Sequence, residues 1–343
     1  MAFQVSPGVE VKEIDATSVV PAVSTSIGGF AGSFNWGPVE EIVTVGSEKE
    51  LAGNFGTSDS NTFKYFLTAA AFLKYGSALK VVRADAGAVN ATTDGTGQVI
   101  KNKDDYENNY SAGELSKGLW ASKYPGVLGN SISVSICTQG ITSFTGWDYS
   151  SSFDSAPGTS EYATNLGKGS ANDEMHIAII DTNGLFSGTV GAVLETFAYV
   201  SQASDAKKSD GTSNYYKEVI NVSSKYVWWI DHSPTLSDAG SALSSASVTA
   251  FTISTSAIDN SLSGGTDPSS VSVGSIQTAY TLFEDSETVD VNLLFSVPDA
   301  NGSKDIADHL ISIVNARKDC MAFVSPPIED TVSTSSPAAD VKV

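Results

Sequence analysis

The chain has 343 residues, of which 41% are hydrophobic, and it carries 39 acidic and 19 basic residues for a formal net charge of −20. This apolar content excludes an intrinsically disordered chain. The acidic excess argues against nucleic-acid binding and against docking on an anionic membrane, because both need clustered lysine and arginine. No apolar run reaches the length of about 18 residues that a membrane span requires. At about 150 residues per domain, the length predicts about two domains.

The first predicted element is an extended N-terminal arm in which valines surround a Pro-Gly pair. Proline donates no backbone hydrogen bond, so this pair fits an edge strand or the start of a strand. An edge-capable arm at a chain end can pair with its own sheet or with the sheet of a neighbouring molecule, and the residues alone favour neither. The candidate subunit-linking residues of the arm are Val5, Ser6, Pro7, Gly8, Val9 and Val11.

A strand crowded with small residues is predicted over Ser24–Phe34. Its glycines, Gly28, Gly29 and Gly32, allow neighbouring backbones to approach closely. These glycines do not form a phosphate-binding loop, because the sequence has neither the Gly-Lys-Ser/Thr end of such a loop nor a G-x-G-x-x-G run that opens a helix.

Two helices and a strand follow. The first helix begins with a capping box at Ser47 and Glu50 and ends at Gly56. The second helix begins at Asn61 and carries an apolar stripe at helical spacing. A strand over 79–84 completes the order strand, helix, helix, strand, which predicts an α/β layer.

The composition changes over 85–110, where Gly, Thr, Asn and Asp predominate and predict a solvated loop. The acidic residues Asp104, Asp105 and Glu107 lack the ligand order of an EF-hand, so no metal site is predicted there. The region 87–122 is accordingly interpreted as a linker or a reduced insertion.

Alternating and continuous apolar runs predict a series of strands in the middle of the chain, with one helix among them. The strands are expected over 131–137, 175–180, 194–200 and 225–230, and the helix over 215–222.

The C-terminal part alternates helices and strands regularly. Helices are expected to begin at Ser275 and Ser303, with a strand over 289–295 between them and another over Met321–Val324. The last run is continuously apolar, as expected of a buried parallel strand, and this βαβ unit predicts a right-handed crossover. Together the patterns predict a mixed α/β (α+β), multidomain chain, with sheets flanked by helices, a βαβ-like unit near the C-terminus and an extended N-terminal β-arm.

No catalytic motif is recognised in the chain. His176, His232 and His309 each stand alone, without the spacing of a metal site. Asp231, His232 and Ser233 bring the residue types of a hydrolase triad side by side, but adjacent strand residues face opposite sides of a sheet. We therefore assign no catalytic, cofactor-binding or metal-binding residue.

Two other functions remain open from the residues alone. A hydrolase can assemble its site from scattered residues, for instance Asp231, His232 or Ser233 with distant partners. A carbohydrate- or surface-binding module is suggested by the Ser/Thr/Gly richness of the chain and by Trp147.

A series of short segments carries a family resemblance through its order and spacing. The segments are Ser6–Glu13, Phe34–Pro38, Phe55-Gly56, Tyr65-Phe66 through Phe72–Gly76, Leu79–Ala84, Tyr124–Gly126 with Leu128-Gly129, Leu262–Gly265, Ser286–Val291, Ala316–Cys320 and Ser325–Pro327. Together they resemble the contractile tail sheath proteins of T-even-like myoviruses.

The resemblance implies a mechanical role and no enzymatic activity or cofactor. A sheath subunit polymerises with its copies around the tail tube, and the sleeve contracts to drive the tube through the host cell envelope for genome delivery. The implied partners are other sheath subunits, the tail tube protein, and the baseplate and tail terminator proteins. The implied location is the virion tail, with assembly in the host cytoplasm. The arm is implied to add a strand to a neighbour's sheet.

The resemblance also implies a domain organisation. Large family members carry a protruding domain where this chain has only a short region, and the family continues beyond Ser325–Pro327 into a C-terminal domain. The expected divisions are an N-terminal arm over 1–22, a first part of the sheath body over 23–86, a linker or reduced insertion over 87–122, the remainder of the body over 123–330 and the start of an absent C-terminal domain over 331–343.

Overall fold

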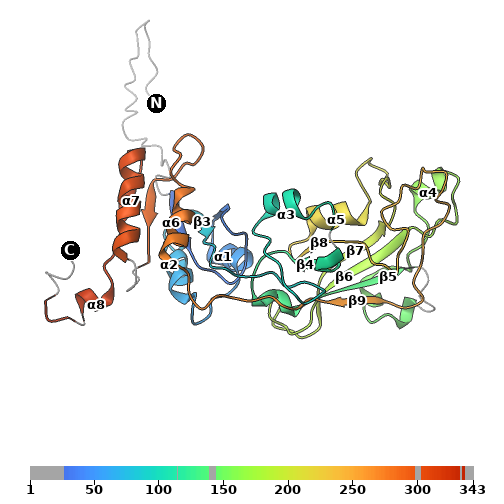
Figure 1. Ribbon diagram of the computed structural model, residues 1–343, viewed down its shortest axis with the longest axis horizontal. Coiled ribbons are helices and arrows are strands. Elements are labelled where there is room, and N and C mark those ends of the chain that lie inside the picture. Colours follow the sequence, from blue (N-terminus) through green and yellow to red (C-terminus); the bar gives the residue numbers. More distant parts are fainter. Residues whose placement is uncertain (1–26, 114, 139–143, 298–302, 333, 337–343) are drawn as a thin grey trace, which may run out of the picture.

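The computed structural model describes residues 27–113, 115–138, 144–297, 303–332 and 334–336. In this part of the chain, two lobes lie end to end along the long axis (Figure 1). The first lobe combines the two separate stretches 27–84 and 271–332, and the residues between them form the second lobe. The chain therefore passes between the lobes twice.

The first lobe is built on a five-stranded sheet in the order β11-β10-β1-β3-β2. Neighbouring strands are parallel except that β2 runs antiparallel to β3. The predicted βαβ unit is confirmed in its parallel pairing, since the parallel neighbours β10 and β11 are joined by α7. The strands are β1 (Ile27–Gly32), β2 (Ile42–Val45), β3 (Ala78–Arg83), β10 (Leu293–Phe295) and β11 (Met321–Phe323).

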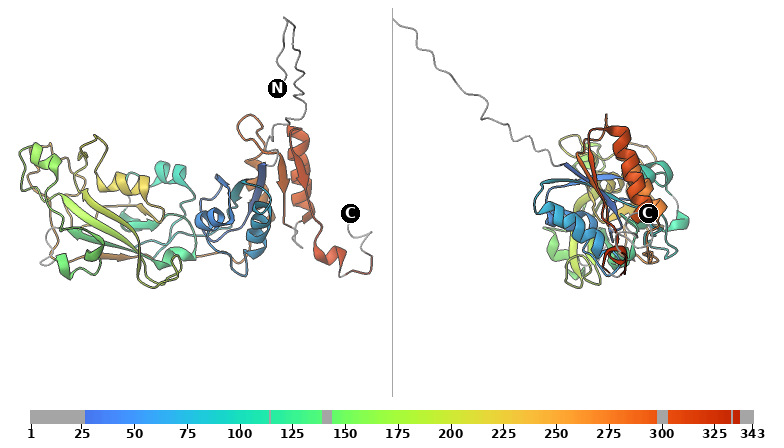
Figure 2. Two further views of the ribbon diagram at one scale, coloured as in Figure 1. Left: turned by 180° about the vertical axis from the view of Figure 1, so that it is seen from behind. Right: turned by 90° about the vertical axis from the view of Figure 1, so that its left-hand side faces the viewer.

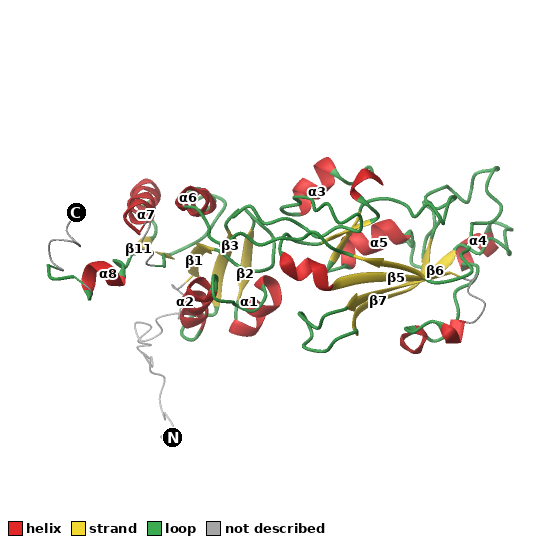
Figure 3. Cartoon of the chain, turned by 60° about the horizontal axis from the view of Figure 1, so that its bottom comes forward, coloured by secondary structure: helices red, strands yellow, loops and turns green. Residues whose placement is uncertain are grey.

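Helices cover both faces of this sheet, as the sequence predicts. One face carries α1 and α2, and the other carries α6 and α7 (Figure 3). In the view from behind, the strands and helices of the first lobe stand roughly upright, perpendicular to the horizontal long axis of the molecule (Figure 2). The helices are α1 (Glu48–Phe55), α2 (Phe63–Leu73), α6 (Val273–Thr281) and α7 (Ser303–Arg317), and the short α8 (Ile328–Thr331) follows β11.

The glycines of β1 lie close to neighbouring side chains. A Cβ atom on Gly29 would lie 2.6 Å from the Leu294 side chain, and one on Gly28 would lie 2.7 Å from the Phe72 ring. Such distances are well inside van der Waals contact, so the central strand accommodates the Phe72 ring from α2 and the Leu294 side chain from the neighbouring strand β10 only because it has no side chains of its own at these positions.

The second lobe contains two antiparallel sheets. One is four-stranded in the order β7-β6-β5-β9, and the other pairs β4 with β8. The strands predicted in the middle of the chain are thus confirmed, as is the helix predicted over 215–222. The elements are α3 (Lys103–Asn109), β4 (Trp120–Ser122), β5 (Ile132–Thr138), α4 (Glu161–Asn165), β6 (Glu174–Asp181), β7 (Ala192–Ser201), α5 (Tyr216–Ser223), β8 (Val227–Trp229) and β9 (Ile258–Ser261), with 3₁₀ turns over Leu115–Lys117, Val127–Ser131, Phe144–Gly146 and Ser150–Ser152.

The predicted loop over 85–110 is wrong in part, because it contains the helix α3. Asn102 caps this helix by accepting a hydrogen bond from the Asp105 backbone N–H at 3.0 Å. Acidic side chains in the first turn complement the positive end of the helix dipole. The residues 87–122, for which we expected a linker or reduced insertion, thus hold α3 and β4. Both pack inside the second lobe, where the Tyr106 and Trp228 rings stack at 4.2 Å.

Two helix starts differ from the prediction. The N-cap of α2 is Thr62, and the Asp59 carboxylate accepts the backbone N–H groups of Asn61 and Thr62 at 2.9 Å each. The N-cap of α6 is Ser272, whose hydroxyl accepts the Ser275 N–H at 3.1 Å. In both cases several capping residues stand in a row, and the sequence alone does not choose among them.

The strand predicted over 289–295 is shorter, because β10 begins only at Leu293. The guanidinium of Arg317 donates to the Val289 carbonyl oxygen at 2.8 Å and to the Phe283 carbonyl oxygen at 2.6 Å. These bonds hold the residues before Leu293 against the end of α7. Only the three residues of β10 therefore remain to pair in the sheet. Among the described helices, none is long and apolar enough to cross a membrane.

Candidate functional site

The strand β11 forms one of the two edges of the first sheet, and it exposes apolar side chains. Met321 is 59% and Phe323 53% exposed, although Ala322 between them packs against the core of the lobe. The prediction of a buried strand is therefore wrong. A parallel strand normally has both faces covered, whereas β11 is the outermost strand and has α7 on one face only (Figure 3).

The helix α2 adds apolar surface to the same lobe. Phe63 and Leu67 lie one turn apart on α2 and are both more than half exposed. Deeper in the lobe, Phe72 stacks on Phe295 of β10 at 5.2 Å between ring centroids, and Phe295 is paired in register with Phe323. Large apolar side chains in the open at a sheet edge are typical of a surface that another polypeptide covers.

The six arm residues named from the sequence, Val5 to Val11, lie outside the described residues. The description begins at Ile27, where the chain enters the centre of the sheet. Asn292, next to β10, anchors this point, since its backbone N–H donates to the Ile27 carbonyl oxygen at 2.9 Å.

The triad residue types at 231–233 do not assemble into a hydrolase site. The ring nitrogens of His232 face the hydroxyl groups of Tyr216, at 2.6 Å, and Tyr215, at 3.2 Å. The Asp231 carboxylate accepts the backbone N–H of His232, and the Ser233 hydroxyl accepts the backbone N–H of Thr235. Burial lowers the pKa of His232. These contacts hold the His232 imidazole in place within the second lobe, and they do not align the Ser233 hydroxyl with a base.

The other residues singled out for chemistry have packing roles. His176 is fully buried and stacks on Phe153 at 4.4 Å. Trp147 is buried as well and donates from its indole N–H to the Ser135 hydroxyl at 2.9 Å, so it offers no exposed platform for a sugar ring. His309 lies on α7 beside Thr281. Within the described ranges, no group of three or more His, Cys, Asp or Glu side chains is placed to hold a metal ion.

A feature that the sequence analysis missed is the junction between the lobes. Phe34 and Trp36 follow β1 and point into different cores. Phe34 packs on Phe55 in the first lobe, at 4.8 Å between ring centroids, whereas Trp36 contacts Tyr124 and Phe186 of the second lobe at 5.4 and 5.0 Å. Trp36 is only 4% exposed. One short loop therefore ties both hydrophobic cores together.

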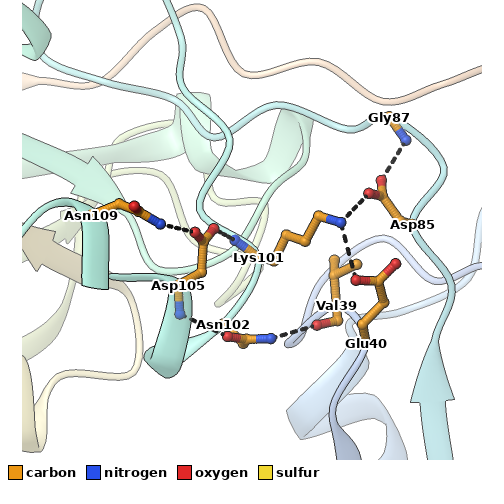
Figure 4. A network of polar contacts seen from close by, with 8 residues as sticks. All are labelled: Val39, Glu40, Asp85, Gly87, Lys101, Asn102, Asp105 and Asn109. Atoms are coloured by element: carbon orange, nitrogen blue, oxygen red, sulfur yellow. Dashed lines mark hydrogen bonds and ion pairs between the residues drawn. The ribbon is translucent and has the colours of Figure 1, made fainter. Parts of the chain in front are cut away.

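Polar contacts reinforce the junction around Lys101 (Figure 4). The Lys101 ammonium lies 2.8 Å from the Asp85 carboxylate and 3.0 Å from that of Glu40. The Val39 N–H donates to the Lys101 carbonyl oxygen, and the Asn102 side-chain amide donates to the Val39 carbonyl oxygen. The bond to Asp85 is the main cause that raises the pKa of Lys101, so this lysine is charged at neutral pH. Glu40 and Val39 belong to the first lobe, and Lys101 and Asn102 to the second.

Arg83, the last residue of β3, is buried at the same place. Its guanidinium donates to the Gly37 carbonyl oxygen at 2.9 Å. Burial lowers its pKa to about 10, and the carboxylates of Asp267 and Asp85 oppose that shift, so it remains a cation at neutral pH. Gly37 itself has φ of 94°, and a Cβ there would lie 2.7 Å from the Asn54 carbonyl oxygen. Only glycine fits this tight passage between the lobes.

A groove of about 800 Å³ opens between the lobes beside Trp36. Its walls come from both lobes, with Glu41 and Val43 on one side and Lys123 and Phe186 on the other. The Lys123 ammonium lies 3.2 Å from the centroid of the Trp228 ring and donates to the Asn221 carbonyl oxygen at 3.1 Å. Burial lowers the pKa of Lys123 to about 7.

Comparison with known proteins identifies the class to which the first lobe is similar. Residues 25–84, which hold β1 to β3 with α1 and α2, match the family model described as "Tail sheath protein Gp18 domain III N-terminal region". Within the first lobe, residues 25–84 are thus similar to part of a tail sheath domain. The resemblance to contractile tail sheath proteins that the sequence motifs predict is thereby confirmed.

The similar curated proteins are all named "Tail sheath protein". The relative from Salmonella phage ViI is 32% identical over 195 residues, which are 56% of this chain and 28% of that protein. The relative from Enterobacteria phage T4 is 44% identical over 79 residues, 23% of this chain and 12% of that protein. The relative from Vibrio phage KVP40 is 42% identical over 78 residues, which are again 23% of this chain and 12% of that protein. The chain thus matches less than a third of the length of these relatives.

Two solved structures of sheath tail proteins are similar at low identity. The one from Listeria innocua has a TM-score of 0.47 and 14% identity, with 89% of this chain and 48% of that chain covered. The one from Desulfitobacterium hafniense has a TM-score of 0.43 and 11% identity, with 92% of this chain and 52% of that chain covered.

Proposed function

We propose that this chain is a structural subunit of a bacteriophage contractile tail sheath. In this role, copies of the protein polymerise around a tail tube, and the sleeve then shortens to drive the tube through the host cell envelope. The observation that carries the proposal is the match of residues 25–84 to a tail sheath domain, in a chain whose relatives are named tail sheath proteins. The protein acts mechanically and is not an enzyme.

The exposed edge of the first sheet supports this proposal. A subunit of a polymer needs exposed apolar side chains that other copies can cover. It also needs unpaired backbone N–H and C=O groups with which another copy can form hydrogen bonds. Met321 and Phe323 of β11 and Phe63 and Leu67 of α2 supply such a surface on one lobe. We assign this face to contacts between sheath subunits.

The N-terminal arm is the second proposed contact. Val5, Ser6, Pro7, Gly8, Val9 and Val11 add an edge strand to the sheet of a neighbouring subunit. Main-chain hydrogen bonds of such an added strand tolerate side-chain variation and survive rotation of the bodies that they tether. The other proposed partners are the tail tube protein, the baseplate and the tail terminator. The proposed location is the virion tail, with assembly in the host cytoplasm.

Deletion of Met1–Ile14 from the full-length protein tests the arm. We expect the circular dichroism spectrum and the thermal midpoint of the body to stay unchanged, while electron microscopy shows no helical tubes. Tubes of normal length from the deletion variant would exclude the assigned role of the arm.

Lysine substitutions on β11 test the sheet edge. Phe323→Lys introduces a charge on the proposed contact, so we expect the length and number of tubes to fall while the subunit stays folded. Val190→Lys is the control, because Val190 is an apolar residue of the second lobe that is 74% exposed, more than Phe323. Equal assembly of both variants would remove β11 from the contact surface.

A further inference from the structure

The two chain passages between the lobes are bonded to each other. Val89, which follows the first passage, and Thr266, which precedes the second, exchange both backbone hydrogen bonds at 3.0 and 3.1 Å. The Gly126 N–H also donates to the Val89 carbonyl oxygen. Such a two-stranded connection resists stretching, but by itself it permits bending, because only a few backbone torsions separate the lobes on each strand.

Side chains add the contacts that oppose bending. Trp36 leaves the first lobe and is buried between Tyr124 and Phe186, with its backbone N–H held by the Phe55 carbonyl oxygen at 3.1 Å. A tilt of the second lobe in any direction separates the indole from at least one of these rings. The burial of a tryptophan side chain is worth several kcal/mol, so the indole acts as an anchor.

Lys101 forms a second contact at a different point of the junction. Its ammonium connects to Glu40 and Asp85, while its own carbonyl oxygen receives the Val39 N–H. Two contact points separated in space prevent the rotation that one alone allows. The groove of about 800 Å³ beside Trp36 shows that the lobes do not fill the space between them, so room for tilting exists once the contacts are lost.

We propose that the junction is an orientation lock, in which Trp36 and Lys101 hold the two lobes at one fixed angle. The hydrogen-bonded passages keep the lobes connected, and Trp36 sets the position of the second lobe against the first. The Lys101–Glu40 ion pair and the backbone bond from Val39 to Lys101 prevent rotation about that anchor. A force on the second lobe is then transmitted to the free sheet edge of the first lobe. This inference concerns the isolated chain and is independent of the proposed polymer.

The distance between the lobes, measured in the full chain, tests the lock. Two nitroxide labels are placed on Lys49→Cys in α1 and Lys207→Cys in the second lobe, in a background where Cys137 and Cys320 are alanine. Pulsed electron resonance gives the distribution of label distances. We expect a narrow distribution for this background and a distribution roughly twice as wide for the added double change Trp36→Ala/Lys101→Met.

Matched controls separate the lock from general loosening. Trp147→Ala removes a tryptophan that is as buried as Trp36 but packs in a separate cluster of the second lobe, and Lys217→Met removes a lysine whose ammonium donates to the Ser111 carbonyl oxygen within the second lobe. Both controls should keep the narrow distribution. Broadening by Trp147→Ala as large as that of the double variant would overturn the proposal, as would a narrow distribution in the double variant itself.

The milder variant Trp36→Phe covers the case in which the alanine change prevents folding. It keeps an aromatic ring between Tyr124 and Phe186 while shortening the side chain, so it should fold and, combined with Lys101→Met, still widen the distribution measurably. Far-ultraviolet circular dichroism confirms that each variant retains its helices and strands. A folded Trp36→Phe/Lys101→Met variant with an unchanged distance distribution would equally contradict the lock.

Discussion

Phe34 and Trp36 are two residues apart in the chain, yet their rings are buried in the hydrophobic cores of two different lobes. An extended chain would send these two side chains to the same side, but the chain bends over residues 35–37, so the two rings point in different directions. This relationship joins a domain similar to tail sheath proteins with a second lobe that sequence patterns alone do not place beside it.

Replacement of Trp36 by alanine should destabilise the protein strongly. The change removes a buried indole and its contacts with the rings of Tyr124 and Phe186. We therefore expect a loss of about 3–5 kcal/mol in the free energy of unfolding. Urea denaturation followed by circular dichroism measures this loss. Tyr75→Ala is the control, because Tyr75 is 95% exposed and should change stability by less than about 0.5 kcal/mol. Similar losses in both variants would contradict the buried position of Trp36.

Replacement of Gly29 by alanine should also be costly. The added Cβ would lie 2.6 Å from the Leu294 side chain, so the sheet must shift, at about 1–3 kcal/mol. Gly53→Ala in α1 is the opposite case, since no atom lies within 4 Å of its added Cβ, and there we expect a gain of about 0.5–1 kcal/mol from helix propensity. Thermal unfolding of the two variants checks that the first change lowers stability and the second raises it. An unchanged unfolding midpoint for Gly29→Ala would contradict the tight packing against the Leu294 side chain.

Replacement of Gln202 by methionine should stabilise the second lobe. The Gln202 amide is buried, and neither its nitrogen nor its oxygen has a hydrogen-bond partner among the described residues. An apolar side chain of similar volume removes this desolvation cost, which is about 1–3 kcal/mol. The neighbouring Ser201→Ala should have the opposite effect, because the Ser201 hydroxyl donates to Asp173 at 2.5 Å. A lower unfolding midpoint for Gln202→Met would indicate a buried water bonded to the amide.

The buried Lys123 should make stability depend on pH. Burial lowers its pKa to about 7 in the folded chain, opposed by the charge of Glu195 and assisted by that of Lys103. The unfolded chain therefore binds more protons than the folded chain between pH of about 7 and about 10, and stability rises with pH there by up to about 1.4 kcal/mol per unit from this group. Below pH of about 7, both states bind the proton and the full cost of burying the charge is present.

Lys123→Met tests this dependence through the difference from the wild-type curve. The variant should be more stable near neutral pH, and the gain should shrink as the pH approaches 10. Lys49→Met serves as the control, because Lys49 is exposed and is not among the charges that act on Lys123, so it should change the slope little. A constant difference between wild type and Lys123→Met across this range would show that Lys123 titrates normally.

Local patterns in the sequence predicted most elements but not their exact ends. The capping box at Ser47 predicted the start of α1, since the Ser47 hydroxyl accepts the Glu50 N–H, and the positive φ of Gly56 ends that helix. The choice among Asn61, Thr62 and Asp59 at the next helix was not readable, because each can cap and only the surrounding packing decides. The helix α3 was missed because its polar composition resembles that of a loop, although Asn102 and the acidic first turn are helix-start signals.

The prediction that β11 is buried was wrong because burial depends on the position of the strand in the sheet. A continuous apolar run indicates a buried strand only if the sheet continues beyond it, and sequence periodicity does not report the position of a strand within a sheet. The junction was missed for the same reason. Lys101 and Glu40 are 61 positions apart, and nothing in their local sequence indicates that they meet.

The sequence by itself determined the type of most elements, the glycine-rich central strand and the resemblance to tail sheath proteins, because these depend on residues that are close together in the chain. The tertiary structure alone decided which segments make up each lobe, that Phe34 and Trp36 belong to different cores, and that the strand β11 is open to solvent. These features depend on contacts between distant segments, whose free energies arise only when the chain has closed the long loops between them.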